Sequence, residues 1–312
     1  MMSYSTINPN LQVAWDATSL AAFRRCPRYY QYNVLEGWRT PHENDDITFD
    51  TIYHEALEKY DKARGNNLAY RDSVRIAVRH ALSASGKRDV SNVFRPWATD
   101  NTAKNRFTLL RTVVWYLTQF ENDAFSTAII PDSGPAVEMS FRLPLPMQSY
   151  TGEAYVLCGH MDRVAQDGDY FQVVDRKTTK QTLSTSWFDR FSPETQMSCY
   201  SVAIRVMFNT ENVRALVDAA QVAVNFSRFV RGSTGRTKAQ MDEWVNDSLY
   251  WIKRAEDCAK DGYWPQNDQA CGLYGKCKFR DICSLDPASR HIFLKSKFVQ
   301  HERWDPLHIR GD

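Results

Sequence analysis

The sequence YVLCGHMDRVAQDGDYFQVVDRK, which runs from Tyr155 to Lys177, has the pattern of a β-hairpin. Two runs rich in Val, Tyr and Phe, residues 155–165 and 170–177, flank the dipeptide Asp167-Gly168. Apolar runs on either side of Asp-Gly are a strong hairpin signal, because this dipeptide favours the tight turns that match strand twist. The sequence therefore predicts two antiparallel strands in this region.

Two carboxylates converge in this hairpin if the chain turns on Asp167-Gly168. The pairing would then place Asp162 opposite Val173 and diagonal to Asp175 on the same face. Their backbone positions would lie roughly 7–8 Å apart, a span that one hard cation can bridge. A different loop length would shift the register and break this geometry.

The alternation of side chains along a strand puts Asp175 and Lys177 on one face. Carboxylate oxygens suit Mg²⁺ or Mn²⁺, which can activate water and neutralise charge on a phosphodiester, while a lysine can position the water or stabilise the transition state. The pattern thus fits phosphodiester hydrolysis. The alternative is an exposed hairpin with ordinary surface charges. A bare Asp-x-Lys sequence more often belongs to such a hairpin than to a catalytic site.

Three other polar residues could join such a site. His54 lies on the apolar side of a predicted helix, where its imidazole could reach a metal, although a single helical histidine is more often a packing or surface residue. Gln196 and Tyr200 are four residues apart on another predicted helix and share a face, so an amide and a phenol could point together at a substrate strand.

The rest of the sequence alternates between helical and strand patterns. Ser19 or Thr18 can cap a first helix, Pro144 is expected to stop the first strand, and Ser192-Pro193-Glu194 supplies a cap and a first turn. Helices are predicted over about 18–34, 49–64, 70–83, 104–125, 192–208 and 238–260, and strands over about 137–143 and 221–226, besides the hairpin.

This order of elements predicts a mixed α/β (α+β) fold. We expect one integrated domain with three regions: a helical part over 1–135, a core with the hairpin over 136–262, and a cysteine loop with a basic tail over 263–312. The helical segment 70–125 is where we expect substrate choice to be determined.

Composition excludes several classes of protein. Hydrophobic residues make up 43% of the 312 residues, which is typical of a globular chain. The first residues lack a signal-peptide pattern and no window is apolar enough for a membrane span, so we expect a soluble, cytoplasmic protein without a membrane partner. The net charge of +2 excludes a global polycation.

Contact with nucleic acid would therefore have to come from local basic patches. Either patch could equally be a solvated surface. The candidates are Arg24, Arg25 and Arg28 near the start, and Arg228, Arg231, Arg236 and Lys238 in a predicted polar loop.

The chain has seven cysteines, an odd number that favours thiols or metal ligands over a disulfide framework. Cys271, Cys277 and Cys283 are evenly spaced and predict three ligands of one centre. Cys26, in Phe-Arg-Arg-Cys-Pro, is the preferred fourth ligand. The other three lie within predicted helices or strands and are interpreted as core residues: Cys158, Cys199 and Cys258.

Four thiolates fit either a [4Fe–4S] cluster or structural Zn²⁺. Zinc sites usually use short Cys-x₂₋₄-Cys pairs, which this sequence lacks, so the cluster is favoured. A centre that joins Cys26 to the far end of the chain would act as a clasp between the termini.

The assembled pattern resembles the RecB-type branch of the PD-(D/E)XK nuclease superfamily, and especially its iron–sulfur members, such as the CRISPR-associated and AddB-like exonucleases. The resemblance extends over most of the chain. It rests, in family order, on Phe-x-x-Cys26-Pro-x-x-Tyr, the helical His54, Gly-His-Met-Asp162-Arg, Val-Val-Asp175-Arg-Lys177-Thr, Gln196-x-x-x-Tyr200 and the late cysteine trio.

The resemblance implies a restriction-endonuclease-like core sheet flanked by helices, with an N-terminal helical lobe and an iron–sulfur clasp. It implies that His54, Asp162 and Asp175 bind catalytic Mg²⁺ or Mn²⁺ and that Lys177 is the catalytic lysine. Gln196 and Tyr200 would contact DNA. The sequence departs from the family in having Asp175 where many relatives have Glu, and in its five-and-five cysteine spacing.

Glu138 matches an acid that many relatives carry and is a candidate to support the metal ligands. The function implied is a DNA exonuclease that hydrolyses phosphodiester bonds at strand ends in recombination, repair or replication, in the host cytoplasm if a phage encodes it. DNA with an accessible single-stranded end, and a helicase or recombinase, are the expected partners. The alternatives are a catalytically silent DNA-end-binding subunit and a zinc-stabilised interaction protein.

Overall fold

The structure is a computed structural model that describes residues 2–41, 45–272 and 276–308. Its residues group into two compact units. Unit 1 comprises Met1–His42, Ser140–Gly159 and Lys238–Asp312, and unit 2 comprises Glu43–Met139 and His160–Thr237. Among the described helices, none is long and apolar enough to cross a membrane.

A mixed sheet runs through the centre of unit 2. Its strands follow the order β9 (Ala154–Asp167), β10 (Tyr170–Thr179), β11 (Val213–Val222) and β12 (Ser227–Gly235). β10 and β11 are parallel, whereas the β9–β10 and β11–β12 pairs are antiparallel. The short β5 (Ser126–Thr127) adds to β9. This is the central mixed sheet that the sequence predicts.

The β9–β10 hairpin forms as predicted, but its predicted register was wrong. The turn residues are Gly168 and Asp169, and the ladder pairs Tyr170 with Asp167 and Val174 with Arg163. Gly168 takes a φ of 57°, which suits the first position of a type II′ turn, and the turn lies one residue later than expected.

This register changes the relation between the two acids. Continuing the ladder by one pair puts Asp175 opposite Asp162, whereas the sequence predicted a diagonal relation. The shift did not break the geometry, because directly opposite residues of an antiparallel pair share a face and lie closer than diagonal ones.

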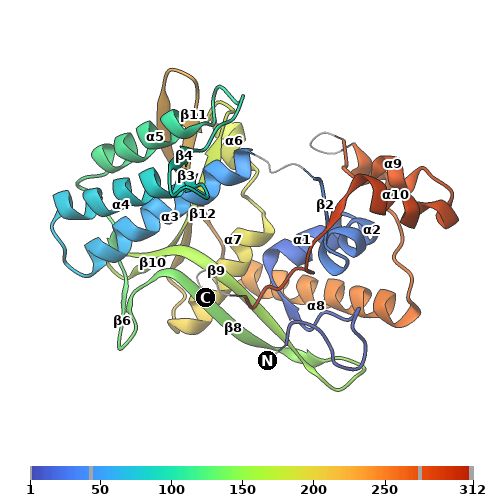
Figure 1. Ribbon diagram of the computed structural model, residues 1–312. Coiled ribbons are helices and arrows are strands. Elements are labelled where there is room, and N and C mark those ends of the chain that lie inside the picture. The colour runs from blue at the N-terminus through green and yellow to red at the C-terminus, as the bar shows by residue number, and fades with distance from the viewer. Residues whose placement is uncertain (1, 42–44, 273–275, 309–312) are drawn as a thin grey trace. The chain divides into compact units, whose positions relative to one another are not determined.

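Three helices of unit 2 pack together on one face of its sheet (Figure 1). They are α3 (Asp45–Gly65), α4 (Tyr70–Ala84) and α5 (Arg106–Gln119). Their shared core contains the α3 residues Tyr53 and Leu57 together with Val222 and Phe229 of the sheet. The helical segment predicted over 104–125 is shorter, because Asn105 caps α5 and the helix ends before Phe120.

The other face of the unit 2 sheet is contacted by α7 (Thr195–Met207), which connects β10 to the parallel β11 and follows the short α6 (Thr185–Asp189). The predicted start of this helix was wrong by a few residues. Glu194 is the N-cap, and its carboxylate accepts a hydrogen bond from the main chain of Met197. A cis peptide bond joins Ser192 to Pro193 just before it.

One predicted strand was misplaced, and another is longer than predicted. The strand expected over 221–226 is β11, which ends at Val222, and the polar loop expected around Arg228 and Arg231 is β12. β8 (Val137–Gln148) continues through Pro144, which the sequence predicted to stop it. β8 pairs only with β9 among the described strands, and proline is tolerated on such an edge strand.

Unit 1 brings the two ends of the chain into one core. The first helix, α1 (Ala17–Arg25), is capped by Asp16 and not by the predicted Thr18 or Ser19. It is followed by α2 (Pro27–Tyr30) and a π-helical turn over Gln31–Leu35. Buried Tyr32 and Trp38 pack with Phe279, Ile282 and Leu294.

The remaining elements are short apart from α8 (Lys238–Asp261), which contacts α1 within unit 1. In unit 1, β2 pairs with β13 and β1 pairs with the start of β9. The others are β1 (Ala14–Trp15), β2 (Trp38–Arg39), β3 (Gly86–Arg88), β4 (Phe94–Pro96), β6 (Ile129–Ile130), β7 (Gly134–Pro135), α9 (Arg280–Cys283), α10 (Arg290–Lys297) and β13 (Val299–Gln300).

Candidate active site and cysteine pocket

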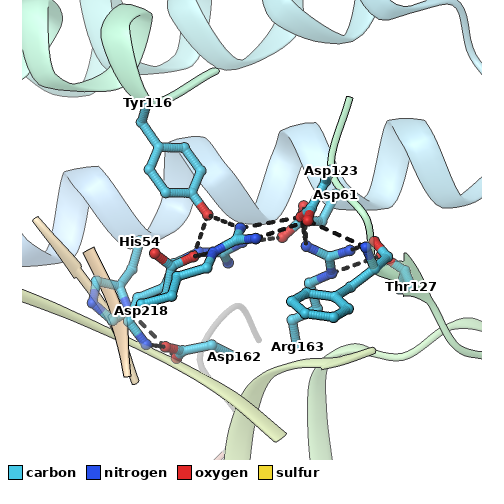
Figure 2. A network of polar contacts seen from close by, with 11 residues as sticks. His54, Asp61, Tyr116, Asp123, Thr127, Asp162, Arg163 and Asp218 are labelled. Atoms are coloured by element: carbon cyan, nitrogen blue, oxygen red, sulfur yellow. Dashed lines mark hydrogen bonds and ion pairs between the residues drawn. The ribbon is translucent and has the colours of Figure 1, made fainter. Parts of the chain in front are cut away.

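Asp162, on β9, lies between an imidazole and a main-chain amide. Nδ1 of His54, from α3, is 3.3 Å from Oδ1 of Asp162. The main-chain N–H of Arg176 donates a hydrogen bond of 2.7 Å to Oδ2 of Asp162. Each carboxylate oxygen of Asp162 is therefore held by one of these contacts. The structure brings together His54 and Asp162 as the sequence predicted (Figure 2).

Asp175 and Lys177 form the second part of the site. Nζ of Lys177 is 2.8 Å from Oδ2 of Asp175, and the Asp175 side chain is only 4% exposed. Apart from this ion pair, Oδ2 has no hydrogen-bond partner among the described residues. A buried carboxylate with a single cationic neighbour is an unfavourable arrangement that a further cation would relieve.

The two acids differ in their protonation behaviour. Burial raises the pKa of Asp175 to about 6, with the negative charge of Asp162 adding to the effect and Lys177 opposing it. Burial would raise the pKa of Asp162 too, but the positive charges of His54 and Arg176 hold it well below its usual range. One acid of the pair therefore ionises readily and the other with difficulty.

The basic groups respond to the same charges. Burial tends to lower the pKa of His54, but the Asp162 carboxylate outweighs it and raises the pKa. The pKa of Lys177 is likewise raised, because the neighbouring Asp175 outweighs the effect of burial. Both side chains thus favour their cationic forms beside the two acids.

Gln196 and Tyr200 continue the site along α7. Nζ of Lys177 donates to Oε1 of Gln196 at 2.9 Å, and Nε2 of Gln196 donates to the hydroxyl of Tyr200 at 3.0 Å. That hydroxyl donates to the carbonyl of His160 at 2.7 Å. Tyr200 is buried, so this chain of hydrogen bonds fixes the position of the Lys177 ammonium.

Sequence reasoning missed a buried charge network behind the site (Figure 2). Arg176 forms an ion pair with Asp61 of α3. Farther along, Asp218 accepts from the hydroxyl of Tyr116 and forms an ion pair with Arg231. Arg231 and Arg163 both pair with Asp123, at 2.7 and 3.0 Å.

Two of these arginines stand beside the candidate metal ligands in the sequence, Arg163 after Asp162 and Arg176 after Asp175. Strand alternation predicts that both arginines lie on the face of the hairpin opposite to that of Asp162 and Asp175. Their partners were not predictable, because Asp61, Asp123 and Asp218 lie on segments far apart in sequence.

Glu138 lies near the start of β8 and is half-buried. It has a φ of 51°, a left-handed conformation that is strained for a residue other than glycine and that is concentrated at functional sites. Its role in supporting the metal ligands stays a prediction.

The donor set fits a hard divalent cation. Two carboxylates are ligands that Mn²⁺ and Mg²⁺ accept, and the imidazole of His54 would join them on Mn²⁺ once it has released its proton. Among the described residues, no three His, Cys, Asp or Glu side chains are grouped as a ready-made metal site. Here His54 and Lys177 each contact one carboxylate, so a bound cation would have to share Asp162 and Asp175 with them.

The four cysteines predicted to share a centre line one small pocket in unit 1. The main-chain N–H of Asn267 lies 3.3 Å from Sγ of Cys26, and the N–H of Cys277 donates to the carbonyl of Cys271. Burial raises the pKa of Cys283, and nearby Cys26 and Cys277 contribute. Residues 273–275 of the loop are outside the described chain.

The other three cysteines do not line this pocket. Cys158 and Cys199 are buried within β9 and α7, and Cys258 is half-buried within α8. Two arginines of the predicted basic patches are bonded within the protein. Arg231 pairs with Asp218, and Arg236 donates to the carbonyl of Phe191 and to the hydroxyl of Ser198.

Comparison with known proteins gives the family. The search of curated protein sequences gives no match. Among solved structures, the chain is similar to a "Putative exonuclease" from Eubacterium rectale, with 9% identity, 91% of this chain and 99% of that chain covered, and a TM-score of 0.44. It is also similar to the protein SSO0001, with 11% identity, 88% and 87% coverage, and a TM-score of 0.35.

The family model described as the PD-(D/E)XK nuclease superfamily matches residues 14–284. This span is most of the 312 residues and includes the whole candidate active site and all four pocket cysteines. The chain belongs to the PD-(D/E)XK nuclease superfamily.

Proposed function

We propose that this nuclease is a DNA exonuclease that uses Mg²⁺ or Mn²⁺, with His54, Asp162 and Asp175 as the metal ligands. The observation that carries the proposal is the buried Asp175 carboxylate, which lies 2.8 Å from Lys177 and is opposite Asp162 in the hairpin register. A metal-dependent phosphodiester hydrolase can combine a cation site with a fixed ammonium beside it, and these residues would supply both.

When bound, the divalent ion supplies water activation and neutralisation of the phosphate charge. The chain's own residues supply orientation. The Arg176 amide directs one Asp162 oxygen, and His54 lies beside the other. Gln196 holds Lys177, whose ammonium would stabilise negative charge on the scissile phosphate.

Gln196 and Tyr200 were predicted to contact DNA. We infer that Tyr200 acts by positioning, since it is buried and bonded to the chain. Gln196 is half-buried and bonded to Lys177, so it could orient the lysine and still approach a DNA strand.

We also propose that Cys26, Cys271, Cys277 and Cys283 hold a [4Fe–4S] cluster that joins the terminal segments of unit 1. The shared pocket supports a common centre, and the absence of a short Cys-x₂₋₄-Cys pair from the sequence favours iron over zinc. Iron, acid-labile sulfide and zinc should be measured in anaerobically purified protein. Iron and sulfide in equal amounts, lost in Cys283→Ser, support the cluster, whereas stoichiometric zinc contradicts it.

The test of activity uses end-labelled single- and double-stranded DNA, with RNA of the same sequence for comparison. The whole protein is incubated with Mg²⁺ or Mn²⁺ beside Asp175→Asn and Lys177→Met, which preserve side-chain size. Cleavage of DNA by the wild type alone, with shortening from a labelled end, supports the proposal. A folded, metal-loaded wild type that binds DNA ends without cutting would make it a silent end-binding subunit.

A further inference from the structure

Helix α5 exposes an aromatic stripe with an arginine at its centre. Phe107, Arg111 and Trp115 are spaced four residues apart and therefore lie along one side of the helix. Phe107 is 78% exposed and Trp115 is 44% exposed. The Arg111 guanidinium lies 5.4 Å from the Trp115 ring centre, so the cation and the ring are in contact.

The turn between β11 and β12 extends this surface. Arg111 donates hydrogen bonds to the carbonyls of Ala223, Val224 and Phe226, at 2.5, 2.6 and 2.9 Å. The side chains of Val224 and Phe226 are 53% and 44% exposed. We call Phe107, Arg111, Trp115, Val224 and Phe226 the aromatic platform.

The platform lies on segments without negative charge. Neither residues 106–120 nor residues 219–237 contain an Asp or Glu, although the chain has 37 acids in 312 residues. The same two segments contain five arginines, of which Arg228 is exposed beside the turn. Exposed aromatic rings on segments that carry arginines and no acids match the chemistry of single-stranded nucleic acid, where bases stack and phosphates carry the charge.

The platform is adjacent to the end of the strand that carries Lys177. Lys177 is opposite Ala219 in the parallel ladder, so the turn at Ala223 begins four residues beyond it, about 13 Å at strand spacing. The start of α5 is tied to the same place. Asp50 of α3 accepts from Thr178, the residue after Lys177, and pairs with Lys104 at 2.7 Å.

We propose that the aromatic platform binds the single-stranded part of the DNA substrate outside the catalytic site, by stacking of bases on Trp115, Phe226 and Phe107. This inference rests on the proposed nuclease function, and it names a second contact region for the same substrate. Arg111 keeps the helix and the turn together and supplies positive charge between the rings. Stacking is tolerant of sequence, so the platform would not select particular bases.

The experiment measures the affinity of labelled oligothymidylates by fluorescence anisotropy. The whole protein carries Asp175→Asn throughout, so that cleavage does not consume the probe. Trp115→Ala with Phe226→Ala is compared with Tyr250→Ala, which removes an exposed ring (58%) on α8 of unit 1. We expect the double variant to weaken binding by at least tenfold, and Tyr250→Ala to leave it unchanged.

Two further measurements sharpen the test. Replacing Trp115 by Phe instead of Ala keeps an aromatic ring at this position and should recover most of the affinity that the double variant loses. Oligonucleotides shorter than about four nucleotides should show a smaller difference between the double variant and the parent, because they are too short to contact all the rings of the platform.

The outcomes separate the two proposals. Equal affinity of the double variant and its parent for long strands overturns the platform and leaves the nuclease proposal standing. A double variant that changes only its state of association identifies a protein interface and also overturns the platform. A parent that binds no oligothymidylate of any length overturns the platform, and cleavage of DNA by the wild type then decides the nuclease proposal separately.

Discussion

The main-chain N–H of Arg176 donates a 2.7 Å hydrogen bond to Oδ2 of Asp162. Arg176 is the residue between Asp175 and Lys177, so the strand that carries one candidate metal ligand also orients the other. Its side chain points to the opposite face, where it pairs with Asp61 of the helix that carries His54. Helix α3 is thus linked to β9 through His54 and Asp162 and to β10 through Asp61 and Arg176.

Breaking the buried Arg176–Asp61 pair should be costly. Asp61 is 3% exposed, and Arg176→Met leaves it with only the longer ion pair to Arg163, at 4.0 Å. We expect a loss of about 3–5 kcal/mol in the free energy of unfolding, and a partial recovery in the double variant with Asp61→Leu. Urea unfolding measures both. A single variant that loses less than about 1 kcal/mol would show that the pair does not act as a buried ion pair.

Gln196 should affect the rate of cleavage more than substrate binding. Gln196→Ala removes the acceptor that holds Lys177, so we expect kcat to fall by about tenfold while KM changes little. Steady-state kinetics with a labelled oligonucleotide measures this difference. If KM rises and kcat stays the same, Gln196 contacts DNA as the sequence suggested and does not position the lysine.

The stability of the metal-free protein should depend on pH through the titration of Asp175. Its pKa is raised to about 6 from 3.8, so the folded state holds this proton more tightly than the unfolded state does. The resulting stabilisation is complete below the unfolded pKa and is lost as pH rises through about 6.

Asp175→Asn removes this titration. We therefore expect the variant to gain stability relative to the wild type, on the order of 2 kcal/mol, between about pH 4 and about pH 7.5 in the presence of EDTA. Urea unfolding at the two pH values gives the difference. A stability difference that is the same at both would contradict the raised pKa.

The hairpin register depends on the conformation of Gly168. Its φ of 57° suits glycine, and a Cβ added there would meet no atom within 4 Å. Gly168→Val should destabilise the fold by about 1–2 kcal/mol through backbone strain alone, while Gly168→Asn should cost less because Asn adopts this region readily. Thermal unfolding compares the two. Equal effects would show that strain at the turn is not the cause.

The sequence predicted those parts of the site that depend on local pattern. The hairpin and the proximity of Asp162 to Asp175 follow from strand alternation around a turn signal. The register did not, because Asp167-Gly168 and Gly168-Asp169 are both acceptable turns and only the paired strands decide between them. For α1, Asp16 and Ser19 are both good caps, and their reciprocal hydrogen bonds decide in favour of Asp16.

The buried side of the site could not be predicted in this way. β12 has a polar sequence that suggests a loop, and Arg231 is accommodated inside only because Asp123 and Asp218 reach it from distant segments. Such pairing is a tertiary effect that no local pattern contains. The cysteines are the opposite case, because the even spacing of three of them predicted one centre, Cys26 was chosen as the fourth by elimination, and all four line one pocket.

The most direct test of the central claim is Mn²⁺ binding, measured by calorimetry or by the electron paramagnetic resonance of the free ion. The account predicts a Mn²⁺ site in the wild type whose affinity falls at least about tenfold in Asp162→Asn and in Asp175→Asn and is retained in Lys177→Met. Binding that is unaffected by either Asp substitution would contradict the assignment of the hairpin carboxylates as metal ligands.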